Sequence, residues 1–166
     1  MSVQSTNEPF RYNLLAKRRR STIARAALYL GAVAVLATGV LHIQQYYSAD
    51  YSSVPTIGTL FFMNFVSAVI VAVGLIAPLR RVAGRYADAV RSVFAVAGIG
   101  IAVLSLAALF ISESSGLFGF AEHGYRTAIT LAIVAEAAAA VFLAIFLVAN
   151  GAGPRAIRRR SPSPAT

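Results

Sequence analysis

The chain has 166 residues, of which 58% are apolar and 13% are charged. Soluble domains carry roughly 25% charged residues, so this composition argues against an ordinary soluble protein and indicates a membrane protein. The sequence contains no cysteine, which excludes disulfide bonds, thiolate metal sites, iron–sulfur clusters and cysteine nucleophiles.

The chain begins with a basic segment, residues 1–25, which we expect on the cytoplasmic side. The apolar run after it is longer than the 7 to 15 residues typical of a signal-peptide core, and no small-x-small cleavage site follows. We therefore expect this run to be retained as a helix.

Four apolar runs predict membrane-spanning helices at residues 26–46, 57–77, 93–111 and 127–148. Each is close to the ~20 residues that cross a ~30 Å hydrocarbon layer. The runs are apolar or small on every face, unlike the amphipathic helices of a soluble bundle. The sequence predicts an all-α, four-helix transmembrane bundle over residues 26–149, with an antiparallel up-down topology, followed by a basic and disordered tail at 150–166.

Basic residues are distributed unevenly along the chain. Of the 15 Lys and Arg residues, all except Arg126 lie before or at the start of the first run, in the second loop or in the tail. The positive-inside rule then places both termini in the cytoplasm of a multi-pass protein of the bacterial inner membrane. We expect these charges to contact anionic lipid head groups, and not nucleic acid, because no nucleic-acid motif accompanies them.

Helix ends and interfacial residues are marked by specific residue types. Pro55 and Gly58 should introduce the second helix, Pro78 should end it, and Asn150-Gly151 should cap the fourth. Aromatic residues in the two outer loops have the character of an interfacial belt. They are Tyr46, Tyr47 and Tyr51 in the first loop and Phe118, Phe120 and Tyr125 in the second.

Small and polar residues recur at helical spacing, which predicts the packing faces, since small residues let membrane helices approach closely. In the first helix this face ends at His42. The predicted faces are Ala27, Gly31, Ala34, Thr38 and His42; Asn64, Ser67, Val71 and Gly74; Gly98, Ala102, Ser105 and Ala108; and Ala132, Glu136 and Ala139 or Ala140.

Glu136 is the strongest functional pointer, because it lies in the middle of the fourth apolar run. A carboxylate at that depth must be paired, protonated or hydrated, so such groups often mark a pathway or a binding site. His42, Asn64 and Ser105 should lie nearer the outside and form a polar column with it. A purely structural role, as hydrogen-bonding partners between helices, is the alternative for all four residues.

Glu122, His123 and Arg126 form a second polar cluster in the predicted outer loop. No nucleophile and base occur at a recognisable spacing, so we expect neither catalytic residues nor an enzyme. No set of metal ligands is evident.

The segment HIQQYYSADYSSVPTIGTLFFMN, residues 42–64, and the later GFAEHGYRTAITLAIVAE resemble uncharacterised small four-helix integral membrane proteins of high-GC bacteria. This resemblance covers the four helices and their outer loops. It implies the same topology and the same outer polar positions, and it implies no activity.

Three functions remain as hypotheses. The first is a non-enzymatic small subunit or accessory protein that binds a membrane partner or a second copy of itself. The second is a proton-coupled carrier or ligand binder that uses Glu136. The third is a redox subunit with a haem ligated by His42 and His123, although His123 is not securely on a helix.

Overall fold

A computed structural model of the chain describes residues 8–116 and 127–151, and within these ranges every regular element is helical. The four long helices are α1 (Glu8–Ser48), α2 (Pro55–Ile76), α4 (Ala87–Ser115) and α5 (Thr127–Asn150). Three short elements connect them: the 3-10 turns η1 (Tyr51–Ser53) and η2 (Gly84–Tyr86), and α3 (Leu79–Ala83). Each long helix contains a stretch apolar enough to cross a membrane, which confirms the expected set of four.

Two of the long helices extend well beyond their predicted bounds, whereas the ends of α2 and α5 differ from the predicted ones by at most two residues. The first begins at Glu8 instead of 26, and the third covers Ala87–Ser115 instead of 93–111. Hydropathy detects only the apolar part of a helix, whereas Lys, Arg, Leu and Ala in residues 14–25 are good helix formers that continue it. The basic segment is therefore helical from residue 8 onward.

The expected helix boundaries are found at α2 and α5. Pro55 is the first residue of α2, where its missing N–H costs no helical hydrogen bond. The backbone N–H of Gly58 donates to the carbonyl of Val54 (2.7 Å), and a Cβ at Gly58 would lie 2.5 Å from the carbonyl oxygen of Tyr51. Gly151 ends α5 with φ +80°, a conformation that favours glycine.

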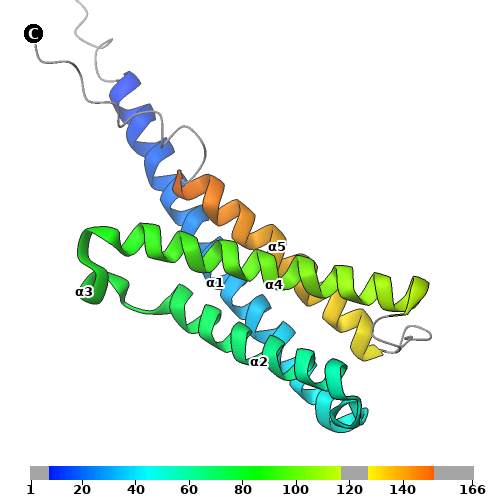
Figure 1. The fold of residues 1–166 in the computed structure, drawn as a ribbon. Coiled ribbons are helices and arrows are strands. Elements are labelled where there is room, and N and C mark those ends of the chain that lie inside the picture. The colour runs from blue at the N-terminus through cyan, green and yellow to red at the C-terminus, as the bar shows by residue number, and fades with distance from the viewer. Residues whose placement is uncertain (1–7, 117–126, 152–166) are drawn as a thin grey trace, which may run out of the picture.

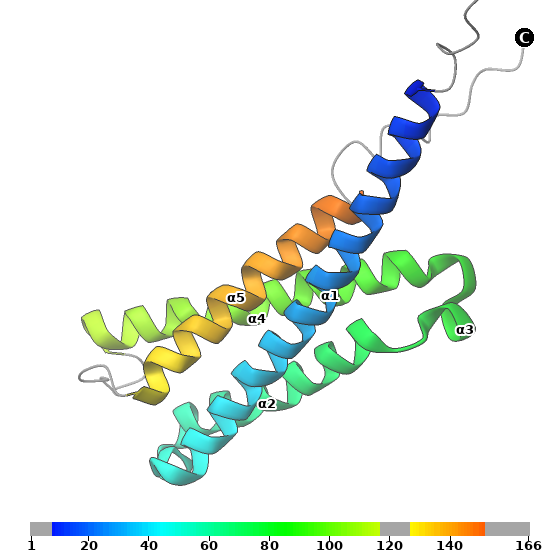
Figure 2. The same ribbon diagram turned by 180° about the vertical axis from the view of Figure 1, so that it is seen from behind.

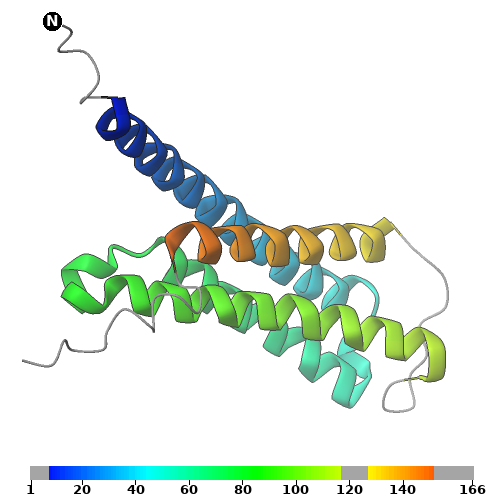
Figure 3. The same ribbon diagram turned by 90° about the horizontal axis from the view of Figure 1, so that it is seen from above.

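The four long helices form a ring. α1 packs mainly against α5 and α2, and α4 packs against the same two helices, while α1 and α4 make fewer contacts with each other (Figure 1). α1 runs obliquely to α4 and α5 (Figure 3). Its first part extends beyond the other helices (Figure 2).

A leucine wedged between glycines forms the centre of the packing. Leu143 of α5 is 0% exposed. Cβ atoms added at Gly31 of α1 and Gly98 of α4 would lie 2.5 Å and 2.6 Å from its methyl groups. Only glycine allows both helices to approach this side chain, so the predicted small-residue faces of α1 and α4 are the buried ones.

Two arginines bind the carboxyl-terminal ends of helices. Arg91 donates from Nε to the carbonyl of Leu75 and from Nη2 to that of Ala77, both at 3.1 Å. Arg20 donates to the carbonyl of Val148 at 2.9 Å. These carbonyls lie at helix ends, where too few helical N–H donors remain, and a cation also suits the helix dipole there. The carbonyls of Ala77 and Val148 also accept from the backbone N–H groups of Leu79 and Gly151, at 2.8 Å and 3.3 Å. The expectation that the basic residues only contact lipid is thus incomplete.

The turn between α1 and α2 buries one residue of the predicted aromatic belt. Asp50 adopts a left-handed conformation (φ 57°), and Tyr51 behind it is only 5% exposed and packs on Phe61 with ring centroids 4.7 Å apart. Tyr51 is therefore not a surface residue, whereas Tyr47 is 73% exposed. The second aromatic group, Phe118, Phe120 and Tyr125, lies outside the described residues, as does the tail after Gly151.

Candidate functional site

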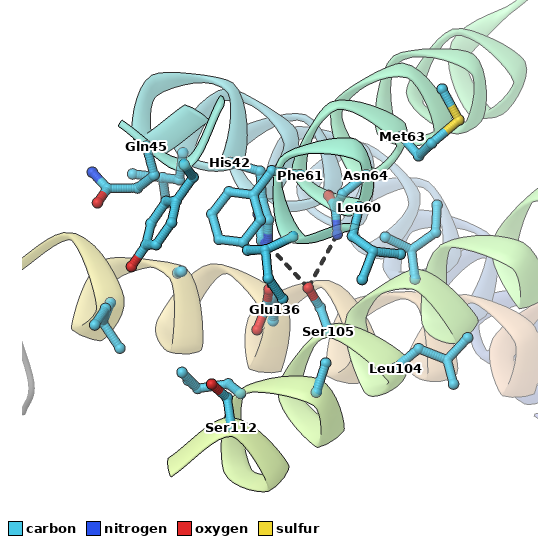
Figure 4. A pocket seen from close by; sticks show the side chains of 18 of the residues that line it. His42, Gln45, Leu60, Phe61, Met63, Asn64, Leu104, Ser105, Ser112 and Glu136 are labelled. Atoms are coloured by element: carbon cyan, nitrogen blue, oxygen red, sulfur yellow. Dashed lines mark hydrogen bonds and ion pairs between the residues drawn. The ribbon is translucent and has the colours of Figure 1, made fainter. Parts of the chain in front are cut away.

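Four polar side chains, one from each long helix, meet near the η1 end of the ring (Figure 4). His42 comes from α1, Asn64 from α2, Ser105 from α4 and Glu136 from α5. Sequence spacing placed each of them on a packing face, and the structure brings all four together.

Glu136 occupies the buried stripe of α5. The stripe follows helical spacing of three and four and consists of Ile129, Glu136, Ala139, Leu143 and Phe146. Because Glu136 stands among its apolar members, the side chain is carried into the interior and is only 2% exposed. A carboxyl group there requires hydrogen-bonding partners or a proton.

Ser105 connects the other three residues. Its Oγ accepts from Nδ2 of Asn64 at 3.0 Å and lies 3.1 Å from Nε2 of His42 (Figure 4). The carboxyl group of Glu136 is within reach of the same hydroxyl and is its third partner. One hydroxyl group offers one donor and two acceptor positions, so these three contacts use its full capacity.

His42 is oriented by its own helix. Its Nδ1 lies 2.9 Å from the carbonyl oxygen of Thr38, which can only accept, so Nδ1 carries a hydrogen. Nε2 then faces Ser105 and lies 3.8 Å from Oε1 of Glu136. The ring packs against Phe61 with centroids 4.9 Å apart. The imidazole is thus held with Nε2 pointing at the carboxyl group.

Asn64 has one satisfied and one unsatisfied amide atom. Nδ2 donates to Ser105, whereas Oδ1 is buried and has no hydrogen-bond partner within the described chain. A buried acceptor without a partner costs about 1–3 kcal/mol. Native proteins rarely keep such a group without an explanation.

A cavity of about 320 Å³ adjoins the four residues, and all four line it. This volume lies at the lower end of the range for small-molecule sites, roughly 300–1,000 Å³. Most of the wall is apolar. Its rim includes Leu60 and Met63 of α2 and Leu104 of α4, which are 45%, 48% and 71% exposed. Leu60 and Leu104 lie on opposite sides of this rim (Figure 4). The cavity therefore reaches the surface between α2 and α4, at a place where the surface is apolar.

Two wall residues, Tyr51 and Phe61, were missed as site residues by sequence reasoning. Tyr51 was missed because the left-handed turn that folds it inward has no clear signal in the sequence. Phe61 lies three residues before Asn64 on α2, and this spacing could have indicated that it shares the face.

Other predicted elements of the site are not placed. Glu122, His123 and Arg126 lie outside the described residues, so haem ligation by a histidine pair stays a prediction. Within residues 8–116 and 127–151 there is no group of three or more metal-ligating side chains.

Comparisons of the chain with protein families, with curated proteins and with solved structures give no match.

Proposed function

We propose that this protein is a multi-pass membrane protein that binds a small amphipathic ligand in the cavity between its four long helices. The ligand has an apolar body and a head group that donates hydrogen bonds. The observation that carries this proposal is the unpartnered Oδ1 of Asn64 in the wall of a cavity that also contains Glu136.

The polar atoms of the cavity wall determine which head group the ligand would have. The Oδ1 atom of Asn64 accepts hydrogen bonds only, and the carboxyl group of Glu136 accepts them when ionised. An amine or a hydroxyl group would supply the missing donor, and an ammonium group would also neutralise an ionised Glu136. The apolar wall and the rim formed by Leu60, Met63 and Leu104 fit an alkyl or aromatic body.

The rim also supports a route to the cavity from the membrane. A cavity that reaches the surface between two apolar helices is accessible to molecules dissolved in the hydrocarbon layer. A ligand that partitions into the bilayer could reach Asn64 without passing through water.

Ligand binding fits these contacts better than a role limited to docking a partner subunit. Small residues would let a partner helix approach closely, but those of the packing faces are used within the chain, where Gly31 and Gly98 pack on Leu143. A role in ordering the bundle accounts for the bond between Asn64 and Ser105. It does not account for the cavity or for the unpartnered Oδ1.

The orientation in the membrane forms part of the proposal. We infer an antiparallel bundle in a bacterial inner membrane, with both termini and the α3 region in the cytoplasm and η1 outside, because the basic residues gather on one side. The basic segments would then contact anionic lipid head groups. In this orientation the cavity lies in the outer half of the bilayer. We infer that the protein is not an enzyme and that it resembles small four-helix bacterial membrane proteins.

Hexylamine and hexanol are suitable probes, because they share one alkyl body and differ in the head group. Each should raise the free energy of unfolding of the full chain in lipid nanodiscs, by about 2.7 kcal/mol at a concentration one hundred times its dissociation constant. Ala108 lines the cavity, so Ala108→Leu should fill it and remove both effects. Glu136→Gln should weaken the effect of the amine more than that of the alcohol.

Ala107→Leu is the matched control, because Ala107 is exposed on the same helix and does not line the cavity. This variant should respond to both probes as the parent does. Equal stabilisation of the Ala108→Leu variant and the parent would show that the probes act through the bilayer, and it would refute binding in the cavity.

A further inference from the structure

We propose that Glu136, Ser105 and His42 form a proton relay, in which one proton passes between the carboxyl group and the imidazole through the serine hydroxyl. This goes beyond ligand binding, since it assigns the site a proton-exchange activity. The relay needs no ligand, so it can be tested separately from the function proposed above.

The distances require an intermediary. Nε2 of His42 and Oε1 of Glu136 are 3.8 Å apart, which is too long for a hydrogen bond. The hydroxyl of Ser105 lies beside both groups: its Oγ is 3.1 Å from Nε2 of His42, and the carboxyl group of Glu136 is within reach of it. A proton that moves between acid and base along hydrogen bonds must therefore pass through Ser105.

The hydrogen bonds fix the starting state. Since Nδ1 of His42 donates to the carbonyl of Thr38, a neutral imidazole has its lone pair on Nε2. The hydroxyl of Ser105 then donates to Nε2. A protonated Glu136 donates its own O–H to Oγ of Ser105, and Nδ2 of Asn64 fills the remaining acceptor position.

The transfer step is balanced. The O–H bond of Glu136 breaks as its proton binds Oγ of Ser105, while the original Oγ–H bond breaks and that proton binds Nε2 of His42. The product is a carboxylate, an unchanged serine and an imidazolium. Its Nε2–H donates to Oγ, and the serine hydroxyl now donates to the carboxylate. The net charge of the three groups is zero before and after.

The same positions of the heavy atoms suit both states, because Ser105 has one donor and two acceptors in each and Asn64 donates in each. The asparagine thus fixes the position of the serine without taking part in the transfer. Among the other described residues of the cavity wall, only Tyr51 of η1 is titratable, and none is Lys, Arg or Asp. The described wall therefore supplies no charge that favours one end of the relay.

The cavity connects the relay to water or a ligand mainly through His42. Both end residues line the cavity, but the side chain of His42 is 12% exposed and that of Glu136 only 3%. A proton that leaves Glu136 for water therefore passes through Ser105 and His42. A ligand that needs a carboxylate would obtain one by moving the proton to His42.

The test measures how fast Glu136 exchanges its proton after a light-triggered pH jump. The full chain in lipid nanodiscs is followed by time-resolved infrared absorption of the carboxylic acid, and the Glu136→Gln variant identifies the band. Ser105→Ala should slow the exchange at least about tenfold, which corresponds to about 1.4 kcal/mol in the barrier. Ser105→Thr keeps a hydroxyl group and should retain the rate.

A second relay variant and a matched control complete the exchange measurement. His42→Gln replaces the proton acceptor with an amide of similar polarity and should slow the exchange as Ser105→Ala does, even if the latter folds poorly. Ser67→Ala removes another hydroxyl from the wall of the same cavity and should leave the rate unchanged. Exchange as fast as in the parent in a folded Ser105→Ala or His42→Gln variant would overturn the relay.

Discussion

Gly98→Ala should destabilise the bundle, because the new methyl group has no space. A Cβ at this position would lie 2.6 Å from Cδ1 of Leu143, 3.2 Å from Cγ1 of Val71 and 3.3 Å from Cγ2 of Val35. These contacts come from α5, α2 and α1, so the methyl group is confined on three sides. Overpacking of this kind costs about 1–3 kcal/mol.

Gly100→Ala provides the matched control. Gly100 lies on the same helix, and nothing lies within 4 Å of the position of an added Cβ. Both substitutions gain the same helical preference of alanine over glycine, about 0.5–1 kcal/mol. That gain cancels in the comparison, so the two variants should differ in the free energy of unfolding by the overpacking cost of about 1–3 kcal/mol.

Unfolding can be followed by helical circular dichroism during titration with sodium dodecyl sulfate, since the chain has no tryptophan. A third variant tests the cause. Leu143→Ala alone should cost about 2–5 kcal/mol, because it leaves a cavity in the centre of the ring. In that background Gly98→Ala should no longer destabilise, because its main clash is gone. Equal stabilities of the Gly98→Ala and Gly100→Ala variants would refute the reasoning.

Three further predictions concern charge and orientation. Arg91→Gln should lower the free energy of unfolding by about 1.5–3 kcal/mol, the value of hydrogen bonds made by charged groups. Arg80→Gln, at an exposed position of the neighbouring α3, should have little effect in the same titration. Glu136→Gln should preserve membrane assembly and Glu136→Lys should impair it, as measured by the yield of monodisperse protein; equal yields would contradict a buried position for this residue. A cysteine at Ser52 should react with an impermeant thiol reagent added to intact cells and one at Ala83 should not; the reverse pattern would invert the proposed topology.

The number and type of long helices could be predicted from hydropathy alone, because apolar runs near 20 residues have few alternatives. The ends could not. α1 begins within a segment whose charges hide its helical preference, and the short helix α3 is too brief to produce a periodic pattern. The role of Arg91 was also invisible, since it depends on the bend that returns α4 toward the end of α2.

The meeting of His42, Asn64, Ser105 and Glu136 could be anticipated, because each stands on a small-residue face and such faces pack together. What the pattern could not supply is the distribution of hydrogen bonds. Helical spacing gives the direction of a side chain, but whether Ser105 reaches three partners depends on the relative depth of four separate helices. The cavity could not be predicted either, because it results from incomplete packing.

The two ends of the ring differ in packing, and this difference explains why a polar site can exist in it. Toward α3, α2 and α4 lie so close that a Cβ at Gly74 would be 2.5 Å from the ring of Phe94. Toward η1 the same two helices border the cavity. Close packing at one end can stabilise the fold while the other keeps space beside the polar groups. If so, Gly98→Ala should lower stability and still leave proton exchange at Glu136 intact, and Ser105→Thr should show that a small change at the site has little effect on stability. Loss of both properties in either variant would mean that the two ends act as one unit.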